Sequence, residues 1–328
     1  MTDSLGYNLA QSDKYLKEID VVIMWVDDSF DGYQDTLRKY AKDKFDTDPN
    51  RTRDNLELLR FCLRSLDMYL PEMRRLYLLT QRPQVPAWLN TDHPDIRIVH
   101  HDEIADPAVL PTFNSFSILS HVHMLPELGG NYVYLEDDMM LNRMGLMDAL
   151  HRGETPLSLF TEVISKNFDQ IDLGKESPWN QAMANTNRLL NETYGVKPRN
   201  YFMHGPLLFN KRNVENLVSR FAREIAVTRA TRFRDGTNIP IEYFYPHAMV
   251  EEGLAHRSTK AETARVQGFA GLRNFLPWTW FQLWKMERGD PVCFTLNDDF
   301  GPRPNKLVEQ MVCRWLNRHY PQKSQFEI

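Results

Sequence analysis

The sequence predicts an α/β fold in which a mostly parallel β-sheet is flanked by helices. Short runs rich in β-branched and aromatic residues, which are typical of buried strands, occur at residues 19–26, 76–80 and 96–99. Apolar side chains recur at helical spacing in residues 54–66, and residues 116–125 are predicted to form a second helix. Strands that alternate with helices in this way favour a largely parallel sheet.

The first half of the chain supplies these elements in order. Residues 1–18 are polar and predict a loosely held N-terminal arm, and residues 28–53 predict a helix and an exposed loop. The helix at 54–66 has Asp54 as a candidate cap, and Glu57 three residues later completes a capping-box pattern. After two glycines, the run that starts at Tyr132 predicts the next buried strand.

The second half is less regular. It predicts two strands at residues 157–163 and 202–209, two helices at 179–193 and 214–225, a basic loop at 226–240, a last strand at 292–296 and an amphipathic C-terminal helix at 307–316 that Pro321 stops. Repeats and low-complexity linkers are absent from the sequence. We therefore expect a single domain over residues 19–328.

Aromatic residues crowd residues 264–290. Trp278, Trp280, Phe281 and Trp284 could form a hydrophobic cover or a lipid-facing patch. We favour packing inside the core, because scattered aromatic residues usually pack internally.

The bulk composition is that of a globular protein of 328 residues with 42% hydrophobic and 25% charged residues. A net charge of −5 and a pI near 6.1 argue against a nucleic-acid partner. Three cysteines in apolar stretches fit reduced thiols. The polar start and the lack of an 18-residue apolar run predict a cytoplasmic protein without a membrane span, and they leave peripheral membrane association and the oligomeric state open.

Three consecutive carboxylates, Glu136, Asp137 and Asp138, follow the apolar strand that starts at Tyr132. In open α/β sheets, ligands bind at the C-terminal ends of the strands. Adjacent carboxylates repel each other and resist burial unless a cation neutralises them. The cluster indicates a divalent-metal site for a nucleotide-activated substrate, and the alternative is an acidic loop.

A second strand end has the same form, because the apolar run at 292–296 leads into Asn297, Asp298 and Asp299. Two strand-end acid clusters provide enough oxygen ligands for Mg²⁺ or Mn²⁺. We predict Asp138 and Asp298 as the metal ligands.

The first strand carries Asp20 and ends in Trp25, Val26 and Asp27. An acid at a strand end can hold a ribose hydroxyl, and a nearby tryptophan can stack on a base. The alternative is a strand end with a capping aspartate.

A group of basic residues comprises Arg53, Arg60 and Arg64, with Asn55 beside them. Arg60 and Arg64 are four residues apart, so they share a helix face and repel each other. Such a pair suggests a bound anion such as a diphosphate. The alternative is salt bridging to Asp54, Glu57 or Asp67.

His204 lies in a Gly-Pro turn, and Arg232 and Arg234 alternate around a phenylalanine. In an extended segment both guanidinium groups would point the same way. They could clamp a phosphoryl group, and His204 is a candidate general base because its ordinary pKa lies near neutrality. A lone histidine is more often structural.

The chain as a whole resembles the Stealth family of sugar-1-phosphate transferases, which includes bacterial capsular polysaccharide phosphotransferases and the GlcNAc-1-phosphotransferase α/β catalytic region. Four blocks carry the resemblance, near residues 19–30, 51–141, 180–250 and 291–328. They include Ile19-Asp-Val-Val-Ile-Met-Trp-Val-Asp27, Arg53-Asp-Asn55, Leu110-Pro-Thr-Phe-Asn-Ser115, Tyr134-Leu-Glu-Asp-Asp138, His204-Gly-Pro206, Arg232-Phe-Arg234 and Leu296-Asn-Asp-Asp299. The chain departs from the family pattern at Asp28-Ser29-Phe30, at Leu119 and at Glu136, where Gly-Ser-Asp, Glu and Asn are usual.

The resemblance implies a Rossmann-like, GT-A-like fold and transfer of a hexose-1-phosphate from a UDP-sugar, UDP-GlcNAc above all, to a carbohydrate hydroxyl with release of UMP. It implies catalytic roles for Asp138, His204, Arg232 and Asp298, with Asp137 or Asp138 as rivals of His204 for the base. It implies substrate contacts from Asn114, Ser115, Asp137, Arg234 and Asn297 besides the residues named above. Two alternatives stay open: a metal-dependent glycosyltransferase that releases UDP, and an inactive nucleotide-sugar-binding homologue.

Overall fold

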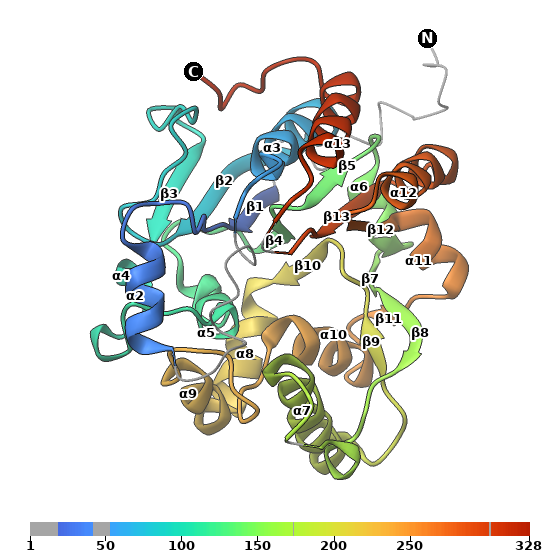
Figure 1. Ribbon diagram of the computed structural model, residues 1–328. Coiled ribbons are helices and arrows are strands. Elements are labelled where there is room, and N and C mark those ends of the chain that lie inside the picture. Colours follow the sequence, from blue (N-terminus) through green and yellow to red (C-terminus); the bar gives the residue numbers. More distant parts are fainter. Residues whose placement is uncertain (1–18, 42–52, 173, 302) are drawn as a thin grey trace.

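The central sheet has the strand order β10-β4-β1-β2-β3 (Figure 1). Its strands are β1 (Ile19–Met24), β2 (Met73–Thr80), β3 (Ile96–His100), β4 (Asn131–Glu136) and β10 (Leu207–Asn210). β1 pairs in parallel with β2 and β4, β2 pairs in parallel with β3, and only β10 runs antiparallel to its neighbour. The predicted α/β fold with a mostly parallel sheet is confirmed.

The computed structural model describes residues 19–41, 53–172, 174–301 and 303–328. The predicted arm at 1–18 and most of the predicted loop before Arg53 lie outside these ranges. Within the described part of that second segment, α2 (Tyr33–Tyr40) is a helix, as the sequence predicts.

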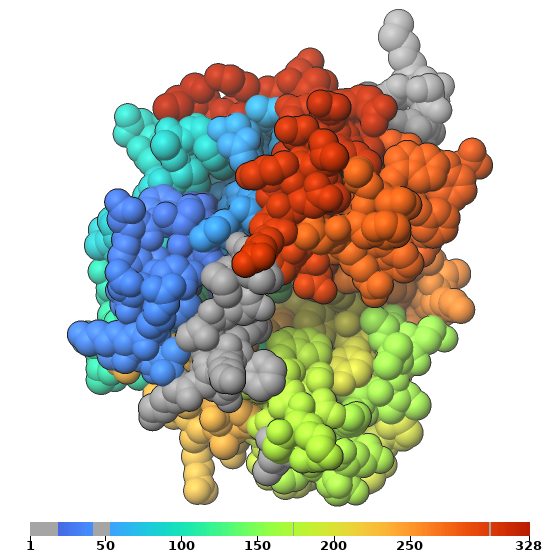
Figure 2. Space-filling model, in the orientation of Figure 1, coloured from blue at the N-terminus to red at the C-terminus, as the bar shows by residue number. Residues whose placement is uncertain are grey.

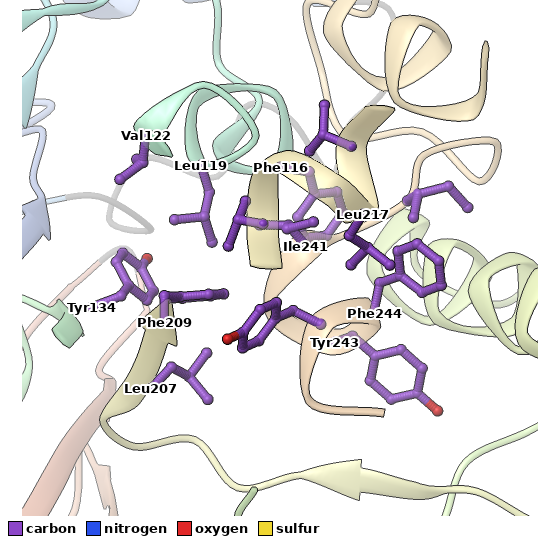
Figure 3. Packing of buried hydrophobic residues seen from close by; sticks show 14 of the residues in the cluster. Phe116, Leu119, Val122, Tyr134, Leu207, Phe209, Leu217, Ile241, Tyr243 and Phe244 are labelled. Carbon is purple, nitrogen blue, oxygen red and sulfur yellow. The ribbon is translucent and has the colours of Figure 1, made fainter. Parts of the chain in front are cut away.

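Both faces of the sheet are buried, which explains why its strands are apolar without alternation. On β1, Val22 packs into one core cluster, and Val21 and Ile23 pack into another. The first cluster draws on the helices α5 (Ser115–Leu119), α7 (Pro178–Tyr194), α8 (Lys211–Arg220) and α10 (Ile241–Glu251), as Figure 3 shows for Phe116, Leu217, Ile241 and Phe244. The second is covered by α3 (Leu58–Tyr69) through Leu59, Cys62, Leu63 and Leu66.

A smaller sheet adjoins the first and carries the last part of the chain. Its strand order is β12-β13-β5, formed by β12 (Gln267–Arg273), β13 (Cys293–Asp299) and β5 (Met139–Leu141). β13 runs parallel to β12 and antiparallel to β5. The helices α12 (Leu276–Gly289) and α13 (Lys306–His319) belong to its core cluster. β5 follows β4 after a two-residue turn, so the two sheets meet at the predicted acid cluster.

The remaining elements are short. They are α4 (His101–Ile104), η2 (Pro107–Val109), η3 (Val122–Met124), α6 (Leu146–Ala149), β6 (His151–Arg152), β7 (Thr155–Ser158), β8 (Phe160–Ile164), η4 (Phe168–Gln170), β9 (Asn200–Phe202), α9 (Ala222–Arg229), β11 (His256–Arg257) and α11 (Lys260–Val266). No helix among the described residues is both long and apolar enough to cross a membrane.

Several predicted boundaries are wrong for local reasons. The helix at 54–66 begins at Leu58, because Glu57 has a φ of 53° that no α-helix accepts. The Gly-Pro pair after His204 divides the strand predicted at 202–209 into β9 and β10. The helix predicted at 214–225 is two helices, α8 and α9, and α9 extends into the predicted basic loop.

The expected burial of the aromatic residues near the C-terminus is also wrong. Trp278, Trp280, Phe281 and Trp284 lie on the exposed face of α12, where Trp280 is 58% exposed. The buried face of the helix is formed instead by Thr279, Gln282, Leu283 and Met286.

Candidate active site

Two adjoining cavities open at the edge of the central sheet where β1 and β4 end. The smaller, of about 280 Å³, is lined by Met24, Trp25, Val26, Arg53, Asp54, Asn55, Asp137 and Asp138, among others. The larger, of about 570 Å³, is lined by Trp179, Phe202, His204, Glu242, Phe269, Asp299 and Phe300, among others. Both are lined by Ser115, Tyr134, Glu136, Arg234, Asn297 and Asp298. This is the strand-end position at which α/β sheets bind ligands.

A compact acidic cluster stands at the junction of the two cavities. Nε2 of His204 lies 3.4 Å from Oε2 of Glu136 and 3.6 Å from Oδ1 of Asp138. These three side chains can bring one ligand atom each within 4.8 Å of one another. Glu136 and Asp138 are two residues apart, and both reach the histidine, whereas Asp137 lines the smaller cavity.

His204 is held in place through its backbone. Its carbonyl oxygen accepts hydrogen bonds from Nε2 of Gln267 at 2.8 Å and from Oγ1 of Thr295 at 3.0 Å. The next residue, Gly205, packs so closely on Gln267 that a Cβ would come within 2.6 Å of it. The turn therefore needs glycine, and it fixes the imidazole against the end of β4.

The cluster couples three ionisations. Burial on its own would lower the pKa of His204, but Glu136 and Asp138 hold that pKa well above its ordinary value. Burial opposes ionisation of Glu136, yet His204 and Arg234 keep the pKa of Glu136 below its usual range. Burial raises the pKa of Asp138 despite the nearby His204. Without a bound cation, the raised pKa of His204 favours its imidazolium form, whose single positive charge offsets part of the negative charge of the two carboxylates and disfavours a role as general base.

The cluster also fits a divalent cation. Oδ1 of Asp138 and Nε2 of His204 are buried and have no hydrogen-bond partner among the described residues. Two carboxylates and an imidazole form a mixed donor set that suits Mn²⁺, because imidazole is a poorer ligand for Mg²⁺. Asp298, predicted as a ligand, lines both cavities but is outside this compact group.

Further carboxylates surround the smaller cavity. Burial, with Asp138 next in importance, raises the pKa of Asp298 to about 6. Burial likewise raises the pKa of Asp54 to about 6 and that of Asp137 well above its usual range. Asp54 accepts hydrogen bonds from the backbone N–H of Leu58 and from Nε1 of Trp25. The predicted capping box of Asp54 and Glu57 is wrong, because the N-cap of α3 is Glu57 and its side chain makes no cap bond. Asp54 still accepts from the first residue of α3, and it faces the cavity, which the sequence pattern does not indicate.

The two arginines of the Arg-Phe-Arg segment diverge. Arg234 lines both cavities, and its Nε and Nη2 donate to Oγ of Ser115 at 3.0 and 2.7 Å. Arg232 lines neither, and it donates instead to the carbonyl oxygens of residues 108–111, with Tyr40 stacked at 4.2 Å. The prediction that Arg232 faces the phosphoryl group is wrong, because the chain bends here and its guanidinium binds a backbone loop.

Glu242, in the first turn of α10, is a site residue that the sequence analysis did not identify. Its side chain lines the larger cavity, the residue is only 8% exposed, and Oε2 has no hydrogen-bond partner among the described residues. Burial raises the pKa of Glu242 to about 7, although Arg234 acts to lower it. A carboxyl group with this pKa exchanges its proton near neutral pH.

Three predicted substrate contacts have structural roles instead. Asp20 lies fully buried within β1, where it forms an ion pair with Arg74 and accepts from the backbone N–H of Gly129 at 2.7 Å. Asn114 caps α5 by accepting from the N–H of Phe116, and its amide donates to the 231–238 loop. Asp27 accepts from the N–H of Ser29 and does not line either cavity.

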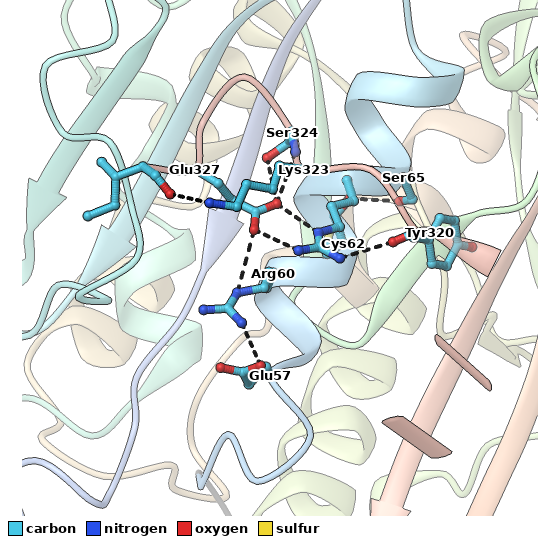
Figure 4. A network of polar contacts seen from close by, with 10 residues as sticks. Glu57, Arg60, Cys62, Ser65, Tyr320, Lys323, Ser324 and Glu327 are labelled. Carbon is cyan, nitrogen blue, oxygen red and sulfur yellow. Dashed lines mark hydrogen bonds and ion pairs between the residues drawn. The ribbon is translucent and has the colours of Figure 1, made fainter. Parts of the chain in front are cut away.

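The predicted anion site at Arg60 and Arg64 is also wrong. Arg64 donates from Nε and Nη2 to the two carboxylate oxygens of Glu327, each at 2.8 Å. Arg60 pairs with Glu57 at 2.7 Å and with Glu327 at 3.7 Å (Figure 4). The salt-bridge alternative is correct for the partner Glu57. Glu327 could not be identified as the second partner because it is 263 residues away from Arg64.

Comparisons with known proteins agree on one family. Residues 51–155 match the family model of Stealth protein CR2, conserved region 2. The capsular polysaccharide phosphotransferase fcs1 of Haemophilus influenzae is 30% identical over 244 residues, which are 72% of this chain and 66% of that protein. The exopolysaccharide phosphotransferase SCO6023 of Streptomyces coelicolor is 30% identical over 94% of this chain and 52% of its own length.

The exopolysaccharide phosphotransferase CpsY of Mycobacterium tuberculosis is 29% identical over 93% of this chain and 57% of its own length. The chain thus spans between about half and two thirds of the length of these relatives. Among solved structures, the galactosyltransferase LgtC, in complex with donor and acceptor sugar analogs, aligns over 94% of this chain and 98% of its own with a TM-score of 0.43 and 12% identity. The family model and the phosphotransferase relatives together establish that this chain belongs to the Stealth family.

Proposed function

We propose that the chain transfers a hexose-1-phosphate from a UDP-sugar to a carbohydrate hydroxyl and releases UMP. The observation that carries this proposal is the cluster of Glu136, Asp138 and His204 at the junction of two cavities that Arg234 also lines. A junction of this kind lets a donor enter from one side and an acceptor from the other. The names of the relatives, capsular and exopolysaccharide phosphotransferases, agree with phosphoryl transfer in the synthesis of a surface polysaccharide.

The two cavities suit the two substrates. The smaller contains Trp25, Val26 and Asn55, an indole and an amide that can contact a base and a ribose, and we assign it to the uridine end of the donor. The larger contains Trp179, Phe202 and Phe269, whose rings can stack on sugar faces, and we assign it to the acceptor. UDP-GlcNAc is the donor proposed.

In the proposed reaction the acceptor oxygen attacks the β-phosphorus of the donor. The bond from that phosphorus to the oxygen that bridges to the α-phosphorus breaks, and UMP leaves. The bond between the sugar C1 and its oxygen stays intact, so the anomeric configuration is retained. The acceptor proton passes to the carboxylate of Glu242, which lines the acceptor cavity and has a pKa of about 7.

Arg234 faces the junction with a guanidinium that Ser115 orients. Its planar fork matches two phosphate oxygens and stabilises the charge that develops on them. Glu136, Asp138 and His204 are the residues that would hold Mn²⁺ or Mg²⁺. When bound, such a cation supplies positive charge against the diphosphate oxygens. His204 then serves as a ligand in place of the base role expected from the sequence.

The identity of the nucleotide that the UDP-sugar releases tests this proposal. The full chain is incubated with Mn²⁺, a panel of UDP-sugars and polysaccharide acceptors, and the nucleotides are separated by chromatography. Release of UMP together with a phosphodiester signal in ³¹P spectra is the expected result. Release of UDP would make the chain a glycosyltransferase, and tight donor binding without turnover would make it a binding homologue.

A further inference from the structure

The exposed face of α12 combines aromatic and basic side chains. Trp280, Phe281 and Trp284 are 58%, 46% and 36% exposed, and their spacing of one, three and four residues places them on one side of the helix. Trp278 and Phe275 extend this surface at the start of the helix. We call these five residues the aromatic face. Rings of this size are rarely left in contact with water over a contiguous surface.

Cations are interleaved with the rings. Lys285 and Arg288 lie on the same side of α12, and both are exposed. The guanidinium of Arg288 stacks on Trp284 at 4.6 Å, and that of Arg273 stacks on Trp278 at 4.7 Å. The aromatic face therefore carries a positive charge of its own.

Positive charge exceeds negative charge on this side of the helix. Glu287 is the only acid in the sequence of α12, and its carboxylate accepts a hydrogen bond from Nε1 of Trp315 at 2.7 Å, on the neighbouring helix α13. Arg273, Lys285 and Arg288 outnumber this one partly exposed acid, so a partner of α12 meets aromatic rings on a surface with net positive charge. The partner that complements it is apolar and anionic.

We propose that the aromatic face of α12 docks the protein on an anionic lipid bilayer. Aromatic side chains favour the interface between headgroups and acyl chains, and lysines and arginines beside them pair with anionic headgroups. A bound saccharide chain would need acids or amides between the rings to receive its hydroxyl hydrogen bonds. The α12 residues of that type are Gln282, which is buried, and Glu287, whose carboxylate already accepts from Trp315. A second copy of the same patch would bring like charges together.

The docked helix lies beside the active site. β12 leads directly into α12, and its last residue, Arg273, pairs in register with Asp299 of β13, which lines the larger cavity. Phe269 of β12 lines the same cavity. In Figures 1 and 2 this segment, in orange to red, forms part of the outer surface of the molecule. Docking would hold the mouth of the larger cavity close to the lipid headgroups.

Vesicle flotation with the full chain tests this inference and needs no enzymatic activity. Phosphatidylcholine vesicles are compared with vesicles that also contain phosphatidylglycerol. We expect the wild-type chain to float with the anionic vesicles and only weakly with the zwitterionic ones. The triple variant W280A/F281A/W284A should bind at least about tenfold more weakly, because interfacial binding scales with the buried apolar area. The variant K285E/R288E should lose the preference for anionic lipid.

Two variants on other surfaces serve as controls. F168A removes an exposed aromatic ring that stacks on Arg188, and R223E reverses an exposed charge on α9. Both should float like the wild type, and circular dichroism melting should show all variants folded. The inference is overturned if the wild type does not bind anionic vesicles, if the triple variant binds equally well, or if F168A loses as much binding. A further outcome would also overturn it: the wild type self-associates in sedimentation experiments, the triple variant does not, and neither binds vesicles. The aromatic face would then bind a second copy of the chain.

Discussion

The imidazole of His204 and the carboxylate of Glu136 approach to 3.4 Å across the gap between two strand ends. Asp138 completes the group, with Oδ1 at 3.6 Å from the same imidazole nitrogen. Each of the three offers one ligand atom, so a substitution that removes one of them should lower the affinity for the cation. The packing of the hydrophobic core should not change. E136Q and D138N should each lower Mn²⁺ affinity and reduce turnover by orders of magnitude, and chelation by EDTA should abolish the activity that Mn²⁺ or Mg²⁺ restores.

Calorimetric titration with Mn²⁺ in the absence of substrate separates metal binding from catalysis. D148N, which alters an exposed aspartate on α6, is the matched control and should titrate like the wild type. Unchanged Mn²⁺ affinity in both E136Q and D138N would remove these residues from the metal site.

The divergence of the two arginines predicts opposite phenotypes. R234K keeps the charge but loses the fork, so kcat/KM should fall about 10²–10³-fold, as when a single transition-state donor is removed, with little change in Tm. R232K should keep its kcat/KM and lose stability, because lysine cannot reproduce the hydrogen bonds that Arg232 donates to four carbonyl oxygens. Steady-state kinetics and melting curves on the pair decide the assignment, and the reverse pattern would restore Arg232 to the site.

The carboxyl group of Glu242 predicts the pH dependence. Its pKa is raised to about 7, so the fraction of enzyme with an ionised Glu242 grows as the pH rises through 7. If this carboxylate accepts the acceptor proton, kcat/KM should rise with pH over the same range. E242Q should be slow and lose this limb of the profile, whereas E162Q, on the exposed strand β8, should keep it.

The stability of E242Q provides a control on folding. A raised carboxyl pKa means that the fold favours the protonated form, so the native state loses stability as the pH rises from the unfolded pKa towards 7. The neutral amide does not ionise, and E242Q should therefore melt no lower than the wild type at pH 8. An E242Q profile with the same rise near pH 7 would assign the ionisation to another group.

The sequence predicts where the site lies better than it predicts which residues form it. The apolar runs of β1 and β4 end in polar residues, and parallel strands bring these ends to one edge, so the cavity at Trp25 and Asp138 could be expected. The pairing of Glu136 with Asp138 was also within reach, because residues two apart in an extended chain share a side. The predicted partner of Asp138 is Asp298 and not Glu136, because a linear pattern does not measure the separation between two strand ends.

Other features depend on contacts that no local pattern reveals. Glu242 follows Ile241 in an apolar helix, and its access to a cavity is decided by the neighbours of α10. The direction of Arg232 depends on the path of the 108–111 loop, which is far away in the sequence. The aromatic residues of α12 have amphipathic spacing, but spacing cannot tell which face the neighbouring elements cover.

The ion pair of Arg64 and Glu327 predicts how the end of the chain contributes to stability. The two side chains are 9% and 3% exposed, and the pair connects α3 to Glu327. E327Q would leave the Arg64 guanidinium buried without its counter-charge, and loss of one partner of a buried pair costs about 3–5 kcal/mol. D35N breaks the exposed pair of Asp35 and Arg38 and should cost at most about 1 kcal/mol.

The pKa of Glu327 determines the pH below which the ion pair with Arg64 no longer stabilises the fold. Burial alone would raise the pKa of Glu327, but the hydrogen bonds from Arg64 hold it below its ordinary value. A group whose pKa is lowered in the folded state contributes stability above its unfolded pKa, and this contribution is lost as the pH falls through the folded pKa. The difference in the free energy of unfolding between wild type and E327Q, measured by urea denaturation, should therefore be constant near neutral pH and shrink below about pH 4.5, the range in which unfolded glutamates protonate. A difference that is unchanged at low pH would mean that the charge of Glu327 does not stabilise the fold and that the effect of E327Q comes from packing alone.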